Sequence, residues 1–171
     1  MQNVKNEQQV YVGLGSNLGD SEAILLSAVR CIEAIPGVTE VKVSFFYQTP
    51  PISDIPQPDY LNAVCSFRTL LKPRDLFSCL QAIENGHGRL AKPKNAPRRI
   101  DLDILFYGNE SYDDGDLKIP HPHWRERLFV LVPLFELTEN LPWGESISAV
   151  IDSFPIQERT TIRKYHAYCI S

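Results

Sequence analysis

The sequence has no basic run and no basic stripe along its 171 residues, and its net charge is −4. Non-specific binding to nucleic acid therefore has no electrostatic support. No apolar run approaches the length of a membrane span, which excludes a membrane protein of the helical kind. The four cysteines (Cys31, Cys65, Cys79 and Cys169) form no Cys-x-x-Cys pair, and we expect no secretory leader before them. We expect reduced thiols in a cytoplasmic protein, with the first three facing the core.

What is present is the composition of an ordinary globular protein, 43% hydrophobic and 22% charged. The length is that of one domain with a real core, and no repeat or linker divides it. We expect a single domain over residues 1–171, with the polar residues 1–8 disordered.

The pattern of apolar residues predicts alternating strands and helices. Strands are expected at 9–14, 38–48, 60–69 and 100–106, and helices at 21–35, 73–84 and 124–137, followed by a short helix at 147–154 and a last strand. Residues 49–59 are too rich in proline for regular structure, and Asp113, Asp114 and Asp116 mark an acidic turn. The order strand–helix–strand–strand–helix–strand predicts an α+β fold of the ferredoxin-like βαββαβ type. An antiparallel sheet would lie between helices in an α/β/α arrangement.

The most informative segment is 97–106, where carboxylates and aliphatic residues alternate. Period-two alternation is typical of a half-buried strand, and it places Asp101 and Asp103 on one face, roughly 6.5 Å apart. Two carboxylates at that spacing suit a hard cation such as Mg²⁺, which needs few protein ligands beside water and phosphate. An edge strand with a solvated acidic face would give the same local pattern, so the rest of the chain must decide.

One glycine pattern resembles a dinucleotide-binding motif but does not match it. Gly13, Gly15 and Gly19 lie between a strand and a helix, like a dinucleotide-binding turn. The spacing misses that motif by one residue, and no acidic residue follows the second strand where one is required. We interpret these glycines instead as letting the strand turn sharply into a capped helix.

Several segments together resemble a known family, 6-hydroxymethyl-7,8-dihydropterin pyrophosphokinase. The motifs, in order, are GLGSNLG (13–19), YQTPP (47–51), QPDYLN (57–62), PRRIDLDIL (97–105), PH (120–121) and RLFVLVPL (127–134). The resemblance runs from about residue 9 to residue 140, close to the family's spacing.

The resemblance implies transfer of pyrophosphate from ATP to the hydroxymethyl oxygen of the pterin, with release of AMP and help from two Mg²⁺ ions. It assigns both metal ions to Asp101 and Asp103, and catalytic roles to these two and to Arg89 and Arg98. The ATP-binding residues would be Gln81, Glu84, Arg89, Arg98, Ile104, His121 and Arg127. A monomer is expected, in a family whose members are in some organisms fused to other folate enzymes.

The pterin pocket follows from the same resemblance. A flat bicyclic ring would lie between the aromatic rings of Tyr60 and Phe129, with its edge read by Asn62. The remaining pterin contacts would be Thr49, Pro51 and Ile52. The proline-rich loop at 49–59 would then act as a substrate lid.

The chain departs from the family in its basic loop. Ala91 stands where a second arginine is usual, and a tryptophan common near 94–96 is missing. Lys92 or Lys94 would replace the arginine only as a point charge. Pro122 follows His121 where an aromatic is common. We expect weaker ATP binding with intact chemistry, so an Ala91→Arg change should alter the Michaelis constant for ATP.

Two other functions are compatible with these residues. A binding module that has lost turnover would explain the altered basic loop, although both aspartates of the Asp-x-Asp pair are retained. A different Mg²⁺-dependent transferase could use the same scaffold, because fold alone does not fix function. The trio of Tyr60, Asn62 and Phe129 argues against the second alternative.

Overall fold

The computed structural model describes residues 6–88, 97 and 99–166. Its elements in chain order are β1 (Gln8–Ser16), α1 (Ser21–Glu33), β2 (Val38–Val43), β3 (Phe46–Thr49), β4 (Tyr60–Thr69), α2 (Pro73–Gly86), β5 (Asp101–Tyr107), β6 (Tyr112–Asp114), β7 (Leu117–Ile119), the 3-10 turn η1 (Trp124–Glu126), α3 (Leu128–Leu137), α4 (Ile147–Asp152), α5 (Ile156–Arg159) and β8 (Arg163–His166). No helix within the described residues is long and apolar enough to cross a membrane.

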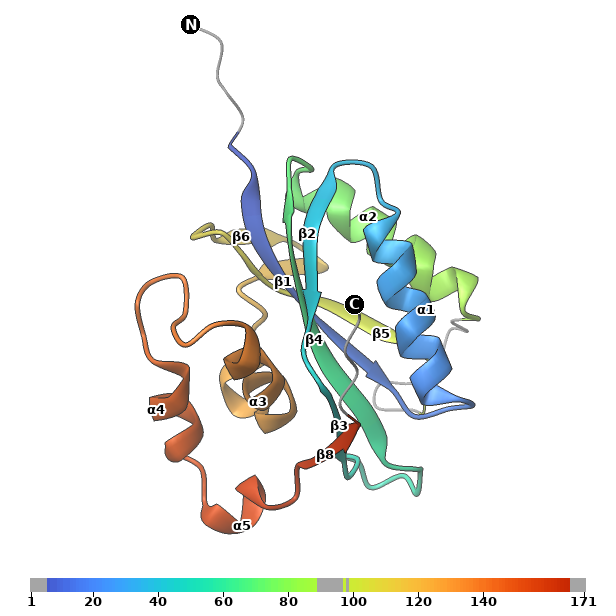
Figure 1. Ribbon diagram of the computed structural model, residues 1–171, viewed down its shortest axis with the longest axis vertical. Coiled ribbons are helices and arrows are strands. Elements are labelled where there is room, and N and C mark those ends of the chain that lie inside the picture. Colours follow the sequence, from blue (N-terminus) through green and yellow to red (C-terminus); the bar gives the residue numbers. More distant parts are fainter. Residues whose placement is uncertain (1–5, 89–96, 98, 167–171) are drawn as a thin grey trace, which may run out of the picture.

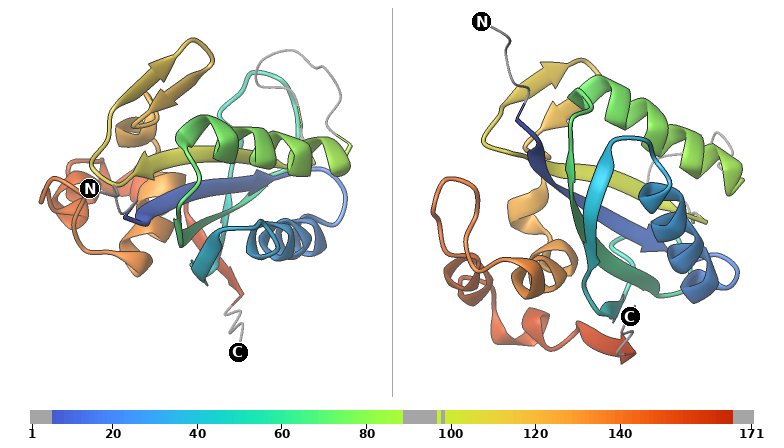
Figure 2. Two further views of the ribbon diagram at one scale, coloured as in Figure 1. Left: turned by 90° about the horizontal axis from the view of Figure 1, so that it is seen from above. Right: turned by 45° about the horizontal axis from the view of Figure 1, so that its top comes forward.

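An antiparallel sheet forms the middle layer, in the order β5-β1-β4-β3-β8, and β2 pairs with the same strand β4 as β3 does. Helices α1 and α2 lie on one side of this sheet, and α3 lies on the other (Figure 1). Figure 2 shows the same three layers from two further directions. The predicted ferredoxin-like α+β fold with its second helical layer is confirmed.

Alternation along the strands gives each helical layer its own core. Val12, Cys65 and Phe67 pack toward α1 and α2, whereas Val64 and Phe106 pack toward α3 and α4. Burial of apolar surface at roughly 25 cal/mol per Å² on both faces is what holds the layers together. The functional residues described below lie on the face of the sheet that carries α3, and at its β5 edge.

Local signals explain where the helices begin. Asp20 caps α1, because its carboxylate accepts a hydrogen bond from the backbone N–H of Ala23 at 3.0 Å. Pro73 occupies the first turn of α2, where its missing N–H costs nothing. Gly37, after α1, has a φ of 86°, which glycine adopts without a steric penalty. These starts and stops agree with the sequence prediction.

The prediction of one strand at 38–48 is wrong, because β2 and β3 are separate strands. The break falls at Ser44. Its Oγ accepts a hydrogen bond from Val64 N at 3.0 Å, and its own N–H donates to Val64 O at 2.9 Å. The side chain of Ser44 thus stays tied to β4 while the regular ladder is interrupted.

The predicted acidic turn is in fact the hairpin β6–β7. Its turn contains Gly115, with a φ of 66°, and Leu117 and Ile119 are buried while the acidic residues Asp113 and Asp114 face solvent. The acidic residues obscured two short strands in the sequence, because most of the buried apolar residues of this hairpin lie on the second strand.

The predicted helix at 124–137 is also divided, into η1 and α3. Arg127 between them is extended, with φ −117° and ψ 93°, and its carbonyl accepts from the N–H groups of Val130 and Leu131. Arg127 is therefore the N-cap residue of α3 rather than an interior helical residue. Two smaller expectations also fail, because Gln8 already belongs to β1 and Cys31 is exposed.

Candidate active site

A cavity of about 490 Å³ opens beside β5, on the side of the sheet that carries α3. Its walls come from β1, β3, β4, β5, α2, the β6–β7 turn and the start of α3. The lining residues are Gly13, Leu14, Gly15, Thr49, Pro50, Ile52, Gln57, Tyr60, Asn62, Ala63, Phe77, Gln81, Glu84, Asp101, Leu102, Asp103, Leu105, Asp116, His121, Arg127, Phe129 and Val130.

Asp101 and Asp103 both line this cavity, as the alternation in the sequence predicted. On β1 the residues paired with them are Gly15 and Gly13. These two glycines lie inside a strand and have no positive φ, so the sequence interpretation of a sharp turn holds only for Gly19, whose φ is 78°. Gly13 and Gly15 instead leave the floor beside the two carboxylates free of side chains.

Two basic side chains approach Asp103. Arg127 Nη1 lies 3.8 Å from Asp103 Oδ2, and His121 Nε2 lies 3.9 Å from the same oxygen. Burial, followed by the charge of Arg127, lowers the pKa of His121 to about 4. The imidazole is therefore neutral near pH 7, and its contact with Asp103 is not a charged pair. Arg127 supplies the positive charge at this point of the cavity.

The other end of the cavity is built on β3 and β4. Asn62 donates from Nδ2 to Thr49 Oγ1 at 2.7 Å, and both side chains are buried. Tyr60, on the same strand, and Phe129, at the start of α3, also line the cavity. Across the sheet, Asn62 pairs with Gly15, which pairs with Asp101. Two strand spacings, roughly 10 Å, therefore separate Asn62 from Asp101 across a residue with no side chain.

The segment 49–59 was predicted to have no regular structure, which is confirmed for residues 50–59 but wrong for Thr49, the last residue of β3. Its far end is held by Asn17, which donates from Nδ2 to Gln57 Oε1 at 2.8 Å and to Pro58 O at 3.1 Å. Ile52 lines the cavity although its side chain is 75% exposed, which places it at the rim.

Helix α2 forms the wall beyond β5. Phe77, Gln81 and Glu84 follow at intervals of four and three residues, so that they share one helical face. Glu84 is buried, and its Oε1 accepts a hydrogen bond from Leu102 N at 2.8 Å. Glu84 thus joins α2 to the outer edge of β5 besides lining the cavity.

Most of the predicted site residues meet in this one cavity, and the exceptions are instructive. The side chain of Ile104 is buried in the core beneath α1 and α2. Pro51 is half-buried between two lining residues, Pro50 and Ile52. Arg89 and Arg98 lie outside the described residues. Ala91, Lys92, Lys94 and the position of the missing tryptophan also lie outside the described residues.

Of the lining residues that were not predicted as site residues, three have a polar or aromatic side chain: Phe77, Asp116 and Gln57. Phe77 could have been found, because it precedes Gln81 by one helical turn. Gln57 belongs to the QPDYLN motif and was overlooked inside it. Asp116 carried no usable signal, since its position depends on the hairpin that the sequence did not reveal.

The carboxylates fit a hard cation only if it has other ligands. Among residues 6–88, 97 and 99–166, no three His, Cys, Asp or Glu side chains gather as a metal site. Mg²⁺ usually takes one or two carboxylates and completes its shell with water and substrate phosphates. Asp101 and Asp103, on one face and open to the cavity, meet that requirement.

Comparison with known proteins shows which family the chain is similar to. The family described as 7,8-dihydro-6-hydroxymethylpterin-pyrophosphokinase (HPPK) matches residues 11–139. A 2-amino-4-hydroxy-6-hydroxymethyldihydropteridine pyrophosphokinase from Pseudomonas aeruginosa is 38% identical over 152 residues, covering 88% of this chain and 94% of the relative. One of the same name from Bacillus subtilis is 40% identical over 142 residues, covering 83% of this chain and 84% of the relative.

Larger proteins contain similar domains. The Plasmodium falciparum HPPK-DHPS wild type with SDX-DHP has a TM-score of 0.68 at 13% identity, covering 88% of this chain and 45% of that one. The chain thus spans about half the length of that solved structure, and the likeness supports the fold alone. The bifunctional protein FolKE of Lactococcus lactis is 38% identical over 133 residues, covering 78% of this chain and 38% of that protein. The Pneumocystis carinii folic acid synthesis protein is 40% identical over 140 residues, covering 82% of this chain and 19% of that protein.

Proposed function

The chain belongs to the 7,8-dihydro-6-hydroxymethylpterin-pyrophosphokinase family, and we propose that the cavity beside β5 is where its two substrates meet. The protein transfers pyrophosphate to hydroxymethyldihydropterin in folate biosynthesis. The proposal adds ATP as the donor, Mg²⁺ as the cofactor and a role for each residue. The observation that carries it is the position of Asp101 and Asp103 between the Asn62 end of the cavity and the α2 wall.

The pterin belongs at the Asn62 end. With Nδ2 committed to Thr49, the amide carbonyl of Asn62 is left to accept hydrogen bonds from the amino and ring N–H groups of the pterin. The rings of Tyr60 and Phe129 would cover its two faces, with Ile52 at the rim. Pro51 would contribute only by fixing the course of the main chain beside the cavity. Across the bare floor at Gly15, the hydroxymethyl group would point to Asp101.

ATP belongs on the other side of the carboxylates. Arg127 and the neutral His121 would donate hydrogen bonds to phosphate oxygens, and Arg89 and Arg98 would add positive charge. Gln81 and Glu84 line the wall that the nucleoside would follow. Ile104 can contribute only through its main chain. Leu102 N–H points away from β1 to reach Glu84, so the main chain of Ile104, two residues further, faces the same outer edge.

Asp101 and Asp103 would hold two Mg²⁺ ions together with phosphate oxygens. When bound, Mg²⁺ supplies charge neutralisation on the triphosphate and polarises the attacked β-phosphate. Asp101 would orient the hydroxyl, whose oxygen would form a bond to the β-phosphorus as its proton is released to water. The bond from that phosphorus to the bridging oxygen of the α-phosphate breaks, and AMP leaves. Arg127 and His121 stabilise the charge that develops on the transferred group.

The chain is proposed to act as a monomer in the cytoplasm, and the family also includes fused proteins. A bifunctional FolKE and a folic acid synthesis protein are among the relatives. The degenerate binding module remains the alternative, supported by the altered basic loop.

The test is ³¹P NMR of the protein with ATP, MgCl₂ and 6-hydroxymethyl-7,8-dihydropterin. AMP appearing together with a pterin diphosphate supports the proposal, and chelation of Mg²⁺ should stop the reaction. ADP would indicate transfer of a single phosphate and contradict it. No turnover with pterin still bound would favour the binding module. Asp103→Asn should abolish measurable turnover, while Asp152→Asn, at a surface carboxylate paired with Arg159, should leave it intact.

A further inference from the structure

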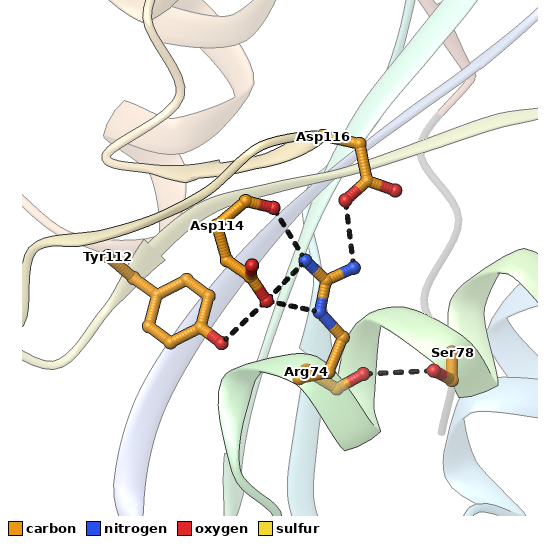
Figure 3. Close-up of polar contacts among 5 residues, drawn as sticks. All are labelled: Arg74, Ser78, Tyr112, Asp114 and Asp116. Atoms are coloured by element: carbon orange, nitrogen blue, oxygen red, sulfur yellow. Dashed lines mark hydrogen bonds and ion pairs between the residues drawn. The ribbon is translucent and has the colours of Figure 1, made fainter.

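Arg74, at the start of α2, joins that helix to the β6–β7 hairpin through four hydrogen bonds (Figure 3). Its Nε and Nη2 donate to Asp114 Oδ2 at 3.0 and 2.7 Å, and Nη2 also donates to the backbone carbonyl of Asp114 at 2.7 Å. Its Nη1 donates to Asp116 Oδ1 at 2.9 Å. Tyr112 adds a hydrogen bond to the same oxygen of Asp114 at 3.2 Å. One guanidinium group therefore fixes both sides of the hairpin turn.

The same guanidinium also contacts a residue of the cavity wall. Arg74 Cζ lies 5.3 Å from the ring centre of Phe77, one helical turn further along α2. Phe77 and Asp116 both line the cavity, although they come from different elements. Arg74 stands behind the two and contacts both. This arrangement makes the spacing between the ring and the carboxylate depend on one side chain.

The chemistry of this wall differs from that of the phosphate end. Arg74 faces two carboxylates. Hydrogen bonding to them raises the pKa of Arg74 and lowers the pKa of Asp114, so the guanidinium stays charged and hydrogen-bonded. The carboxylate of Asp116 would repel a triphosphate but accept hydrogen bonds from hydroxyl groups. In Figure 3 its second oxygen points away from Arg74. An aromatic face beside such an acceptor suits a purine base and its ribose.

We propose that Arg74 is a positioning residue for the nucleoside end of ATP, acting through the ring of Phe77 and the carboxylate of Asp116. The inference rests on the proposed function only in taking ATP as the ligand. It gives the Arg74 cation beside the cavity a role other than binding the phosphates. Loss of Arg74 frees the hairpin turn and the ring of Phe77. It leaves Arg127, Asp101 and Asp103 in place.

The test compares Arg74→Ala and Asp114→Asn with Arg125→Ala. Arg125 is a matched control, because it makes a two-point ion pair with Glu145 at 2.6 Å and lies 4.6 Å over the ring of Trp124. Calorimetry measures binding of a non-hydrolysable ATP analogue and of inorganic tripolyphosphate, each with Mg²⁺. Steady-state kinetics measures KM for both substrates and kcat.

For Arg74→Ala we expect affinity for the ATP analogue to fall about fivefold, with KM for ATP rising to match. Affinity for tripolyphosphate, KM for the pterin and kcat should stay within about twofold, the resolution of such measurements. Asp114→Asn should show the same pattern more weakly, and Arg125→Ala should show none of it. An equal loss for the analogue and tripolyphosphate would overturn the inference, as would an unchanged affinity for the analogue.

The outcome is separable from that of the proposed function. Wild-type protein that binds the analogue but forms no pterin diphosphate would contradict the pyrophosphokinase proposal. The affinity comparison between analogue and tripolyphosphate would still decide the role of Arg74. Conversely, full turnover with no selective loss in Arg74→Ala would leave the enzyme established and remove Arg74 from its nucleotide site.

Discussion

Asn62 on β4 and Thr49 on β3 are diagonal neighbours across the strand pair, and the amide nitrogen of Asn62 donates to the hydroxyl of Thr49 at 2.7 Å in a buried position. This bond decides which way the amide points. Its oxygen, Oδ1, then lies near Gly15, where a Cβ would stand only 3.0 Å away. The pair thus presents an acceptor to the cavity and turns the donor away from it. Under the proposed function, recognition of the pterin edge would depend on that orientation.

Replacing Thr49 with valine should lower pterin affinity, because the buried amide of Asn62 loses its acceptor. A buried polar group without a partner costs about 1–3 kcal/mol, so the free energy of unfolding should fall by a similar amount. Thr49→Ser keeps the hydroxyl and should restore both properties. Pterin binding by calorimetry and urea denaturation measure the two effects. A valine variant that binds pterin as tightly as the wild type would contradict the proposed role of the Asn62 amide.

Adding a methyl group at Gly15 should have a related but sharper effect. The new Cβ would stand 3.0 Å from Asn62 Oδ1 and 3.8 Å from Tyr60 Cδ1, on the floor between Asn62 and Asp101. We expect KM for the pterin to rise about tenfold or more, equivalent to a loss of roughly 1.4 kcal/mol. KM for ATP should change much less.

The matched control for Gly15 is Gly86→Ala in the last turn of α2. Nothing lies within 4 Å of a Cβ there, so activity should be unchanged. Alanine favours a helix over glycine by roughly 0.5–1 kcal/mol, so this variant should be equally or more stable. If Gly15→Ala bound pterin normally, the space above Gly15 would not be the pterin site.

Strong local patterns made much of this molecule predictable. The bounds of β4 were predicted correctly because ten consecutive residues are compatible with a strand, and the helix α1 was predicted from its stripe of apolar residues. The position of Asp101 and Asp103 on one face of a strand was predicted from the alternation of carboxylates and aliphatic residues alone. The motif resemblance, rather than any physical pattern, brought Tyr60, Asn62 and Phe129 together.

What could not be predicted depended on contacts between distant segments. The interruption at Ser44 reflects hydrogen bonds to Val64 on another strand. Asp116 lies on a hairpin that Arg74, far away in the sequence on α2, contacts through a hydrogen bond. The sequence also suggested that Glu84 faces the nucleotide, but gave no hint that its carboxylate binds the backbone of Leu102. Such contacts have no local signature.

Glu84 therefore has two separable roles that substitutions can distinguish. Glu84→Ala removes the acceptor for Leu102 N–H, and the lost hydrogen bond to a charged group should cost about 1.5–3 kcal/mol of stability. Glu84→Gln retains an oxygen acceptor and should keep most of that stability. A rise in KM for ATP in the glutamine variant would then report the carboxylate charge at the nucleotide. An alanine variant as stable as the wild type would refute the structural role.

The last prediction concerns Tyr47, which ties β3 to α3. Its hydroxyl donates to Glu136 Oε1, while the N–H of Phe45 donates to Glu136 Oε2 at 2.9 Å. Burial, followed by the hydrogen bond and charge of Glu136, raises the pKa of Tyr47 well above its ordinary value of 10. Because Tyr47 pairs with Asn62 and α3 carries Phe129, this contact also supports the Asn62 end of the cavity.

The raised pKa has a definite sign for stability. Above pH 10 the unfolded chain loses the Tyr47 proton while the folded protein keeps it, so stability falls as pH rises beyond that point. The fall can reach about 1.4 kcal/mol per pH unit for one proton. Tyr47→Phe should be less stable than the wild type near pH 7, by about 1–2 kcal/mol for the lost hydrogen bond. Its stability should decline less steeply from pH 10 upward, so the difference narrows.

Urea denaturation of both proteins between pH 7 and pH 11 measures this difference. Glu136→Gln is the informative second variant, because it removes the charge and leaves the burial. Since burial is the largest cause of the raised pKa, this variant should keep most of the alkaline decline. Tyr107 and Cys65, whose pKa values burial also raises, contribute equally to the decline of both proteins. Equal slopes for wild type and Tyr47→Phe above pH 10 would therefore contradict the raised pKa of Tyr47.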